Sequence, residues 1–396
     1  MSRKKFLYFF LFTQLYLILN EPYDLNKFIF APNIYVTSII YIVVLIFFQN
    51  KRLHLSSLPI KVNKIFLITS FVWLLYGIFF DDTSYFTRIV FLFITYLFLD
   101  IAYRNNIFEK FWCFNNRFIL VQAILSTICF ILVGIGLLKP LAQYIVIGEY
   151  KTINIYFWGG CFSKTYIGNM IRPSGYFDEP GALAAWAVYG LMFNYAFIKD
   201  KYLNKYLPWF VIPTLSVAYF IQMGVFLILR HVKKVYKLIP ILFLLLVSIT
   251  YINSTKGTDF DIYSKTIARF EYDAETGIAG NSRQIAMENS EKIFWENPWF
   301  GIGGKNFANM ELKLSDNPYE IFAKDGIVGF IITYLPLFMI LFINRRKEIL
   351  IGLIVVAMGY LQRPFHINFI HDLYLWSFLL FCIMDKQKEK IDFKQN

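Results

Sequence analysis

Long apolar runs recur from one end of this chain to the other, and short charged segments separate them. A helix needs roughly 20 residues to cross the ~30 Å hydrocarbon core of a bilayer, and most of these runs approach that length. Of the 396 residues, 57% are hydrophobic and only 17% are charged, whereas a soluble domain is nearer ~25% charged. The sequence therefore predicts an all-α, polytopic membrane protein.

Basic residues gather in alternate connections between the runs, which predicts an orientation because Lys and Arg collect in cytoplasmic loops. The +12 net charge comes from these clusters and does not indicate nucleic-acid binding. The N-terminal Met1–Lys5 is expected inside, and the turn at Asp81 and Asp82 outside. The predicted single spans are Phe6–Leu19, Ile34–Phe48, Ile65–Phe80, Phe86–Tyr103, Phe118–Leu138, Ala182–Ile198, Leu238–Ile252, Ile327–Ile343, Ile349–Leu361 and Ile367–Met384.

The run Leu207–Leu229 interrupts this alternation. If it crossed the membrane once, the basic residues from Arg230 to Lys237 would lie outside, and so would Arg345–Lys347. A broken or re-entrant pair of helices near Pro213–Ser216 keeps both clusters inside, and such backbone is tolerated where protein buries it. Counting the pair as two, we expect about 12 transmembrane helices.

Two long connections, both expected on the outer side, divide the chain into five parts. The expected parts are N-terminal transmembrane helices (1–138), a first outer loop (139–181), central transmembrane helices with the re-entrant hairpin (182–252), a second outer loop (253–320), and C-terminal transmembrane helices with a cytoplasmic tail (321–396). Polar groups concentrate in the two loops. Within the spans, Arg88 and Arg363 are the charges that stand out, and both lie near outer ends.

The most polar short run between apolar blocks is Arg172–Ala182, with the sequence RPSGYFDEPGA. Its arginine can hold an anion, and Asp178 or Glu179 can accept a proton. Its prolines and glycines restrict or permit the backbone shapes that would hold these groups together. The simpler alternative is an ordinary loop whose carboxylates serve the dipole of the following helix. Both interpretations place the run at the mouth of a membrane helix.

Arginine side chains on the outer side are suited to clamping a diphosphate, because the planar guanidinium makes paired, charge-assisted hydrogen bonds. Arg283 is expected in the first turn of a helix that ends at Pro298, where backbone N–H groups also favour an anion. The alternative for each arginine is a side chain that extends along the membrane edge to water. The outer-side candidates are Arg88, Arg172, Arg269, Arg283, Lys305 and Arg363.

Metal and cofactor motifs are not apparent in this sequence. The segment Gly301–Asn306 resembles a P-loop, but Trp299 stands where the first glycine belongs and Asn306 replaces Ser or Thr. The four cysteines are scattered and include no CxxC pair. We therefore expect no metal and no cofactor.

Three segments together resemble the superfamily of O-antigen polymerases (Wzy-type) and O-antigen ligases. Arg172–Ala182 is similar to the family's run of arginine, glycine, phenylalanine and an acidic or amide residue ahead of a helix. Ser282-Arg283 and the later PWFGIG turn, ending at Gly303, resemble its arginine helix and glycine turn. Asp316-Asn317, followed by the DGIVG segment from Asp325, resembles its His-Asn pair before a glycine-rich helix, although no histidine is present here.

The resemblance implies glycosyl transfer at the periplasmic face of the bacterial inner membrane. Its donor would be an oligosaccharide on undecaprenyl diphosphate, its acceptor a hydroxyl of another lipid-linked repeat unit, and its further partners membrane lipid and a chain-length regulator. We assign Arg172 and Arg283 to the diphosphate, with Arg88 and Arg363 as further candidates. Glu179 is the preferred general base and Asp316 the second choice, since a carboxylate beside the acceptor hydroxyl can take its proton.

Three alternatives remain open at this stage. A ligase would transfer the glycan to a lipid A core, and the missing histidine favours a polymerase only slightly. A polysaccharide flippase would need charged residues facing a central cavity and a repeat architecture, and the sequence indicates neither. A non-enzymatic scaffold would leave the arginines of the two loops without a role.

Overall fold

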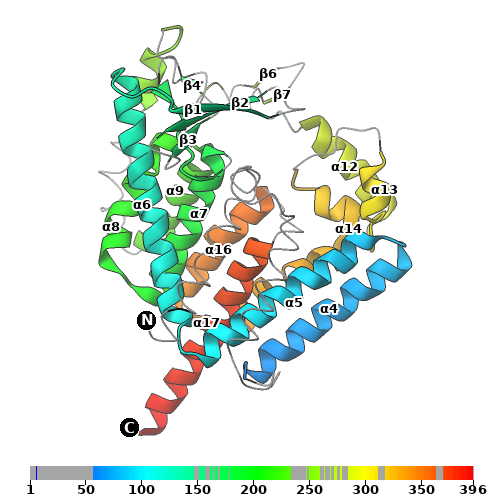
Figure 1. Cartoon of the computed structure of the whole chain (residues 1–396). Helices are drawn as coiled ribbons and strands as arrows, with labels where there is room; N and C mark the ends of the chain where they lie inside the picture. Colours follow the sequence, from blue (N-terminus) through cyan, green and yellow to red (C-terminus); the bar gives the residue numbers. More distant parts are fainter. Residues whose placement is uncertain are drawn as a thin grey trace.

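The helix α17 (Phe369–Gln395) runs through the middle of the bundle in the computed structural model, with its C-terminal end projecting from one end (Figure 1). The structure describes residues 6, 57–146, 151–156, 161–163, 166–167, 170–177, 179–232, 247, 249–258, 263, 268, 272–273, 277–278, 284–310, 317–362 and 369–395. On one side α17 packs against α5 and α15, while α16 beside it packs against α7 and α9. The bundle is thus organised around its last two helices.

Among the described residues, the helices before the first loop are longer than the apolar runs alone suggest. They are α4 (Ile60–Phe79), α5 (Thr83–Arg104) and α6 (Phe108–Gly134), whereas the expected spans Phe6–Leu19 and Ile34–Phe48 lie outside the described residues except for Phe6. The expected span from Phe118 begins ten residues earlier, at Phe108, so Lys110 and Arg117 lie within α6 and not in a loop. The other helices of the described residues are α7 (Pro180–Phe193), continued by a π-helical turn (Asn194–Ile198), then α8 (Lys201–Phe210), α9 (Val217–His231), α12 (Gln284–Glu296), α13 (Gly304–Ala308), α14 (Glu320–Thr333), α15 (Leu335–Ile343) and α16 (Lys347–Gln362).

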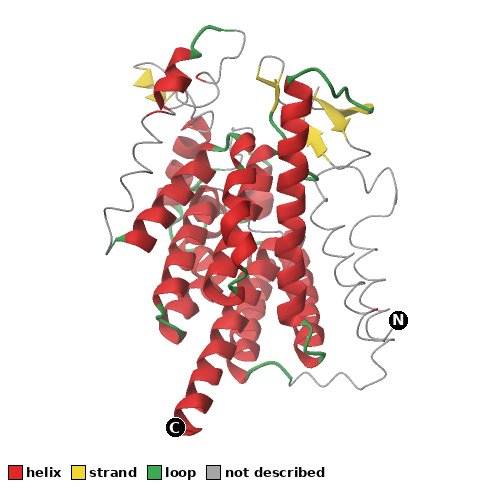
Figure 2. Cartoon of the chain, turned by 90° about the vertical axis from the view of Figure 1, so that its left-hand side faces the viewer, coloured by secondary structure: helices red, strands yellow, loops and turns green. Residues whose placement is uncertain are grey.

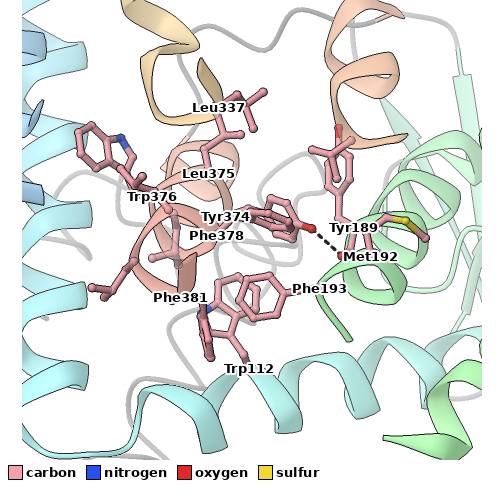
Figure 3. Close-up of a cluster of buried hydrophobic side chains, with 14 of the residues drawn as sticks. Trp112, Tyr189, Met192, Phe193, Leu337, Tyr374, Leu375, Trp376, Phe378 and Phe381 are labelled. Carbon is pink, nitrogen blue, oxygen red and sulfur yellow. Dashed lines mark hydrogen bonds between the residues drawn. The ribbon is translucent and has the colours of Figure 1, made fainter. Parts of the chain in front are cut away.

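Aromatic side chains join the helices at the centre of the bundle (Figure 3). The Trp112 ring of α6 stacks on Phe193 of α7, with ring centroids 4.7 Å apart. Phe193 also meets Phe381 of α17 edge to face at 4.8 Å. The Tyr374 hydroxyl of α17 donates a hydrogen bond of 2.7 Å to the backbone carbonyl of Tyr189, the dashed line in Figure 3. The abundant aromatic residues therefore do more than anchor the chain at an interface, since many of them form the core.

Apolar side chains on the outside of the bundle identify it as a membrane protein. Among the described residues, five helical segments are long and apolar enough to cross a bilayer: Ile60–Phe79, Thr83–Arg104, Phe108–Gly134, Pro180–Ile198 and Glu320–Ile343. On α4, Leu67, Phe71, Ile78 and Phe79 are all more than half exposed. Water would make such a surface unfavourable, whereas lipid tails accommodate it. The expectation of a helical membrane protein is therefore confirmed.

The run Leu207–Leu229 is broken, as the basic clusters on either side of it require. Helix α8 ends at Phe210, a 3₁₀ turn follows (Ile212–Thr214), and α9 starts at Val217. Leu215, which follows the 3₁₀ turn, has a positive φ of 48°, so the helical backbone does not continue through it. Lys347 at the start of α16 donates a hydrogen bond of 3.4 Å to the carbonyl of Arg230 near the end of α9. The second helix of the pair therefore ends beside the basic cluster at the start of α16.

Ion pairs connect neighbouring helices at the end of the bundle where the C-terminus lies. Arg346 and Asp385 form an ion pair of 2.6 Å between the start of α16 and α17. Arg117 of α6 reaches Asp200, which precedes α8, at 2.9 Å. The Phe108 ring at the start of α6 stacks on Phe381 of α17. Segments far apart in the sequence thus place their charged ends together.

Strands, which the all-helical expectation did not include, lie at the opposite end of the bundle (Figure 2). The first long loop forms an antiparallel sheet of β1 (Ala142–Val146), β2 (Lys151–Tyr156) and β3 (Cys161–Ser163), and then a hairpin of β4 (Tyr166–Ile167) and β5 (Met170–Ile171). The second loop contributes a short hairpin, β6 (Tyr272–Asp273) and β7 (Gly277–Ile278). The first loop is therefore a folded layer that leads directly into Arg172.

Candidate functional site

Some of the candidate site residues fall within the described part of the chain. Arg172 and Glu179 lie in the first loop motif, and Arg88 lies on α5. Asp316, Arg283, Arg363, Arg269 and the carboxylate neighbour Asp178 lie outside the described residues. The described residues near each of them nevertheless show how the three motifs are held.

Arg172 follows β5, and its guanidinium turns toward the break between α8 and α9. Nε and Nη2 both donate to the carbonyl of Thr214, at 3.1 and 3.0 Å, and Nη2 also donates to the carbonyl of Leu215 at 3.2 Å. These carbonyls close the 3₁₀ turn, where no further helical N–H is available to them. The arginine is half-buried and joins the first loop to the broken helix pair.

The turn after Arg172 is fixed by its contacts with α6. Gly175 has a φ of +59°, and a Cβ there would lie 3.2 Å from the Gln122 side-chain oxygen. The Tyr176 ring stacks on Phe118 of α6, with centroids 6.2 Å apart and an interplanar angle of 3°. Because a side chain at Gly175 would be strained and crowded, this turn needs glycine.

Glu179 is the residue that precedes the first turn of α7, with extended backbone (φ −136°, ψ 150°) and Pro180 as the first helical residue. Its carbonyl accepts from the N–H groups of Ala182 and Leu183, at 2.9 and 3.3 Å. Its side chain makes no capping hydrogen bond to the helix. The half-buried carboxylate therefore lies at the positive end of the α7 dipole and does not cap the helix with its oxygens.

The second and third motifs interlock through their backbones. The N–H groups of Ile302 and Gly303 donate to the carbonyls of Ala323 and Lys324, at 3.1 and 2.9 Å. In the reverse direction, the N–H groups of Ile327 and Val328 donate to the carbonyls of Pro298 and Trp299, at 2.9 and 3.1 Å. The kink of α14 at Gly326 makes these N–H groups available. The two motifs therefore form one structural unit.

Asn317 ties this unit to the helix that follows Arg283. Its Nδ2 donates to the Ser290 hydroxyl of α12 at 2.9 Å, and its Oδ1 accepts from the N–H of Tyr319 at 2.9 Å. Both Asn317 and Ser290 are fully buried. The neighbour of Asp316 is thus anchored to α12, whose first described residue, Gln284, directly follows Arg283.

Asp325, directly before the kink, is the centre of a buried polar network. The Tyr85 hydroxyl donates to its Oδ1 at 2.6 Å, and the Tyr76 hydroxyl donates to its carbonyl at 2.7 Å. Arg88 Nη1 lies 3.8 Å from Asp325 Oδ2. Both charged side chains are buried, at 3% and 0% exposure. An arginine and an aspartate so placed must compensate each other, since a lone buried charge is very costly.

The guanidinium of Arg88 is held on two further sides. Nη2 donates to the Thr333 hydroxyl at 2.7 Å, and Cζ lies 3.9 Å from the centroid of the Trp73 ring. The cation–π contact joins α5 to α4, while the ion pair and the hydrogen bond join α5 to α14. Arg88 is therefore enclosed by protein and does not extend to the membrane edge, as the simpler alternative for it supposed.

Asp82 connects the α4–α5 turn to the same unit. Its Oδ1 accepts from the Ser84 N–H at 2.8 Å, and its Oδ2 accepts from the Lys305 N–H at the start of α13 at 2.7 Å. Burial alone raises the pKa of Asp82, but hydrogen bonds from Ser84 and Lys305, with the positive charge of Lys324, outweigh burial and hold that pKa below its ordinary value. The carboxylate form is thus the one that fits this position.

Sequence reasoning missed several of these buried groups. Asp325 belongs to the third motif but has no role assigned from the sequence. Asp100 and Asp372 lie inside the predicted spans Phe86–Tyr103 and Ile367–Met384 and are not among the predicted site residues. All three aspartates are buried, and Asp100 is paired with Arg104 at 2.7 Å. The available signal was an ionisable residue within or beside an apolar run, which by default indicates a function or a buried partner.

Several buried polar atoms in this region have no hydrogen-bond partner among the described residues. They are Asp325 Oδ2, Arg88 Nε, the Tyr334 hydroxyl and Asp372 Oδ2. Within the same described part of the chain, no group of three His, Cys, Asp or Glu side chains is placed to hold a metal ion. This buried region therefore contains fixed charges and hydrogen-bond donors, but no metal-binding cluster among the described residues.

Comparisons of the chain with protein-family models, with curated proteins and with solved structures gave no match.

Proposed function

We propose that this protein is a surface-polysaccharide (O-antigen) polymerase of the inner membrane. It would transfer a glycan from undecaprenyl diphosphate to a lipid-linked repeat unit at the periplasmic face. The observation that carries this proposal is the interlocking of the PWFGIG turn with the DGIVG kink. The two segments, which both resemble one family, pair through four backbone hydrogen bonds.

The position of the motifs on the bundle agrees with such a reaction. The strands that lead into Arg172, and α12 after Arg283, lie at the end of the bundle opposite the C-terminus (Figure 1). The ion pairs Arg346–Asp385 and Arg117–Asp200 lie toward the other end. Because basic residues favour the cytoplasmic side, we place the motifs in the periplasm and count about 12 crossings, with α8 and α9 as the re-entrant pair.

The proposed chemistry needs no metal. The acceptor hydroxyl attacks the anomeric carbon of the donor sugar, and the diphosphate leaves with the bonding electrons. Arg283 and Arg172 would stabilise the charge that develops on the diphosphate, with Arg363 as a further candidate. Glu179 would take the proton of the acceptor hydroxyl, and Asp316 is the alternative base.

The contacts refine the roles of two arginines in this proposal. Arg172 already donates to the carbonyls of Thr214 and Leu215, so its charge would act on the diphosphate while it holds the broken helix pair. Arg88 is enclosed by Asp325, Thr333 and Trp73. We therefore propose Arg88 as a positioning residue that supports the interlocked turns, and Arg283 as the principal diphosphate ligand.

The test is polymer formation in vitro by the purified protein from lipid-linked repeat units, read on a gel. Glu179→Gln should lower the rate by roughly 10²–10⁴-fold, the usual effect of losing a general base. Arg283→Lys should also fail, since a point charge cannot replace the bidentate guanidinium. Exposed Arg345→Lys is the matched control and should retain its rate. A normal rate in Glu179→Gln with an inactive Asp316→Asn would move the base to the second loop.

Two other functions predict different results in the same system. A ligase would make no polymer from repeat units alone, and a strain lacking it would carry no glycan on its lipid A core. A flippase is favoured by the buried Arg88, Asp325 and Asp372, because charged residues inside a membrane bundle often mark a transport path. A flippase would form no glycosidic bond in detergent, so polymer formed there would exclude it.

A further inference from the structure

Two of the four cysteines come together beneath the first loop. Cys129 lies on the last turns of α6, and Cys161 is the first residue of β3. Both are fully buried, in one cluster with Tyr156 and Ile171. Neither cysteine is engaged in a disulfide in this structure. No CxxC motif signals this pair, because 31 residues separate the cysteines along the chain.

The strand that carries Cys161 is fixed to its neighbours on both sides. Cys161 pairs with Tyr156 in the β2–β3 ladder. Two residues later, the Ser163 hydroxyl donates a hydrogen bond of 3.0 Å to the carbonyl of Arg172. Helix α6 also packs against β3 and β5. Both cysteines therefore lie in one buried cluster at a packed junction between a membrane helix and the folded loop.

The surroundings of Cys161 favour its ionised form. The neighbouring Cys129 thiol lowers the pKa of Cys161, and this effect, with that of the Gly175 and Ser174 N–H groups, outweighs burial, which raises that pKa. Two successive backbone N–H groups that converge on one acceptor form an anion-binding site. A thiolate, and not a thiol, is the form that attacks a disulfide.

We propose that Cys129 and Cys161 are a redox pair that forms a disulfide between α6 and β3. The co-reactant is a small or protein disulfide oxidant. The Cys161 thiolate attacks the oxidant's S–S bond, forms a mixed disulfide and releases one thiolate. Cys129, after losing its proton, attacks the Cys161 sulfur and releases the second thiolate. The two protons lost by the cysteines go to the two released thiolates, so the oxidant gains the two electrons.

The disulfide would fix the turn on which the first motif depends. The N–H groups of Ser174 and Gly175 contact the Cys161 sulfur, and the next residue, Tyr176, stacks on Phe118 of α6. Oxidation joins Cys161 covalently to the same helix and so limits separation of the loop from α6. Because both sulfurs are buried, the exchange takes place before the loop closes on α6 or when it opens.

The direct experiment uses the full-length protein purified in detergent. It is incubated with oxidised glutathione or with dithiothreitol, denatured, alkylated, digested and examined by mass spectrometry. After oxidation we expect a peptide pair joined through Cys129 and Cys161, lighter than the two peptides by two hydrogens. The other two cysteines, Cys113 and Cys382, should be alkylated in both samples. Alkylation of Cys129 and Cys161 in the oxidised sample, or a bond from either to Cys113 or Cys382, would overturn the proposal.

A second measurement is the midpoint of thermal unfolding. It is first compared between oxidised and dithiothreitol-treated wild-type protein. Dithiothreitol should lower the midpoint of the oxidised wild type by a few degrees, because the cross-link restricts the unfolded chain. Cys129→Ser should remove this dependence and accumulate a glutathione adduct on Cys161. Cys382→Ser, also at a buried cysteine, is the matched control and should keep the dependence. A wild-type midpoint that does not respond to dithiothreitol would contradict a disulfide at this junction.

Discussion

Gly301 and Gly326 each pack against the backbone that directly precedes the other glycine. Both have a φ of +67°. A Cβ at Gly301 would lie 2.4 Å from the carbonyl carbon of Lys324, and one at Gly326 would lie 2.3 Å from the carbonyl oxygen of Trp299. The hydrogen bonds that interlock the second and third motifs run on either side of this contact. The close approach of two turns, 25 residues apart, therefore requires glycine at both positions.

Alanine at either glycine should disrupt the interlocked turns. Gly326→Ala places a side chain on backbone (φ 67°, ψ −170°) that is essentially restricted to glycine, at a cost of about 1–3 kcal/mol, and adds a clash with backbone that cannot rotate away. Gly257→Ala is the matched control, since Gly257 has a φ of +74° but open space around its Cβ position. We expect the thermal midpoint of Gly326→Ala to fall well below that of Gly257→Ala. Equal midpoints would show that the turns can separate without cost.

Removal of Arg88 should destabilise the fold. Arg88→Met leaves the Asp325 carboxyl buried without its charge partner, a change that typically costs about 3–5 kcal/mol. Exposed Arg345→Met is the control and should change stability by no more than about 0.5 kcal/mol. The double variant with Asp325→Leu should recover part of the loss, because it removes the isolated charge. If Arg88→Met has a normal thermal midpoint but forms no polymer, Arg88 is a diphosphate ligand and not a positioning residue.

The stability that Asp82 provides should depend on pH. Its folded pKa is lower than its ordinary value, so its contribution is complete above the unfolded pKa of about 3.9 and is lost as the pH falls through the folded pKa. Asp82→Asn removes the negative charge and leaves one side-chain oxygen to accept the hydrogen bonds from Ser84 and Lys305. This should lower the free energy of unfolding by about 1–3 kcal/mol near neutral pH. Asp81→Asn, at the neighbouring and fully exposed aspartate, is the control. Thermal midpoints of wild type and Asp82→Asn should converge in the acid range, and a constant difference would contradict the assignment.

The orientation of the bundle can be tested with single cysteines in a Cys113→Ser background. Asn154 in the first loop is unsuitable, because it is only 4% exposed in β2, whereas its pairing partner Gln143 is exposed. Cysteines at Gln143 and at exposed Asn309 should react with an impermeant thiol reagent in intact spheroplasts. A cysteine at Arg345 should react only after the membrane is broken. Reaction of Arg345→Cys in intact spheroplasts would contradict the re-entrant topology.

The sequence by itself determined the class of this protein and the position of most described helices. Apolar runs such as Ile65–Phe80 and Ala182–Ile198 predict helices that the structure begins a few residues earlier, at Ile60 and Pro180. These features are local, because a span depends on the composition of its own residues. The break near Pro213–Ser216 was also predictable, since charges on both sides constrain it.

Only the tertiary structure decided which polar groups meet. Tyr85 and Asp325 are 240 residues apart, and Arg88 was expected near water but is buried between α4, α5 and α14. The sheet formed by the first loop was likewise not expected, and neither was the contact between Cys129 and Cys161 that depends on it. Composition records how polar a segment is, but a hydrogen bond or ion pair between distant segments depends on how the helices pack. That packing is why the interlocked glycine turns became apparent only in three dimensions.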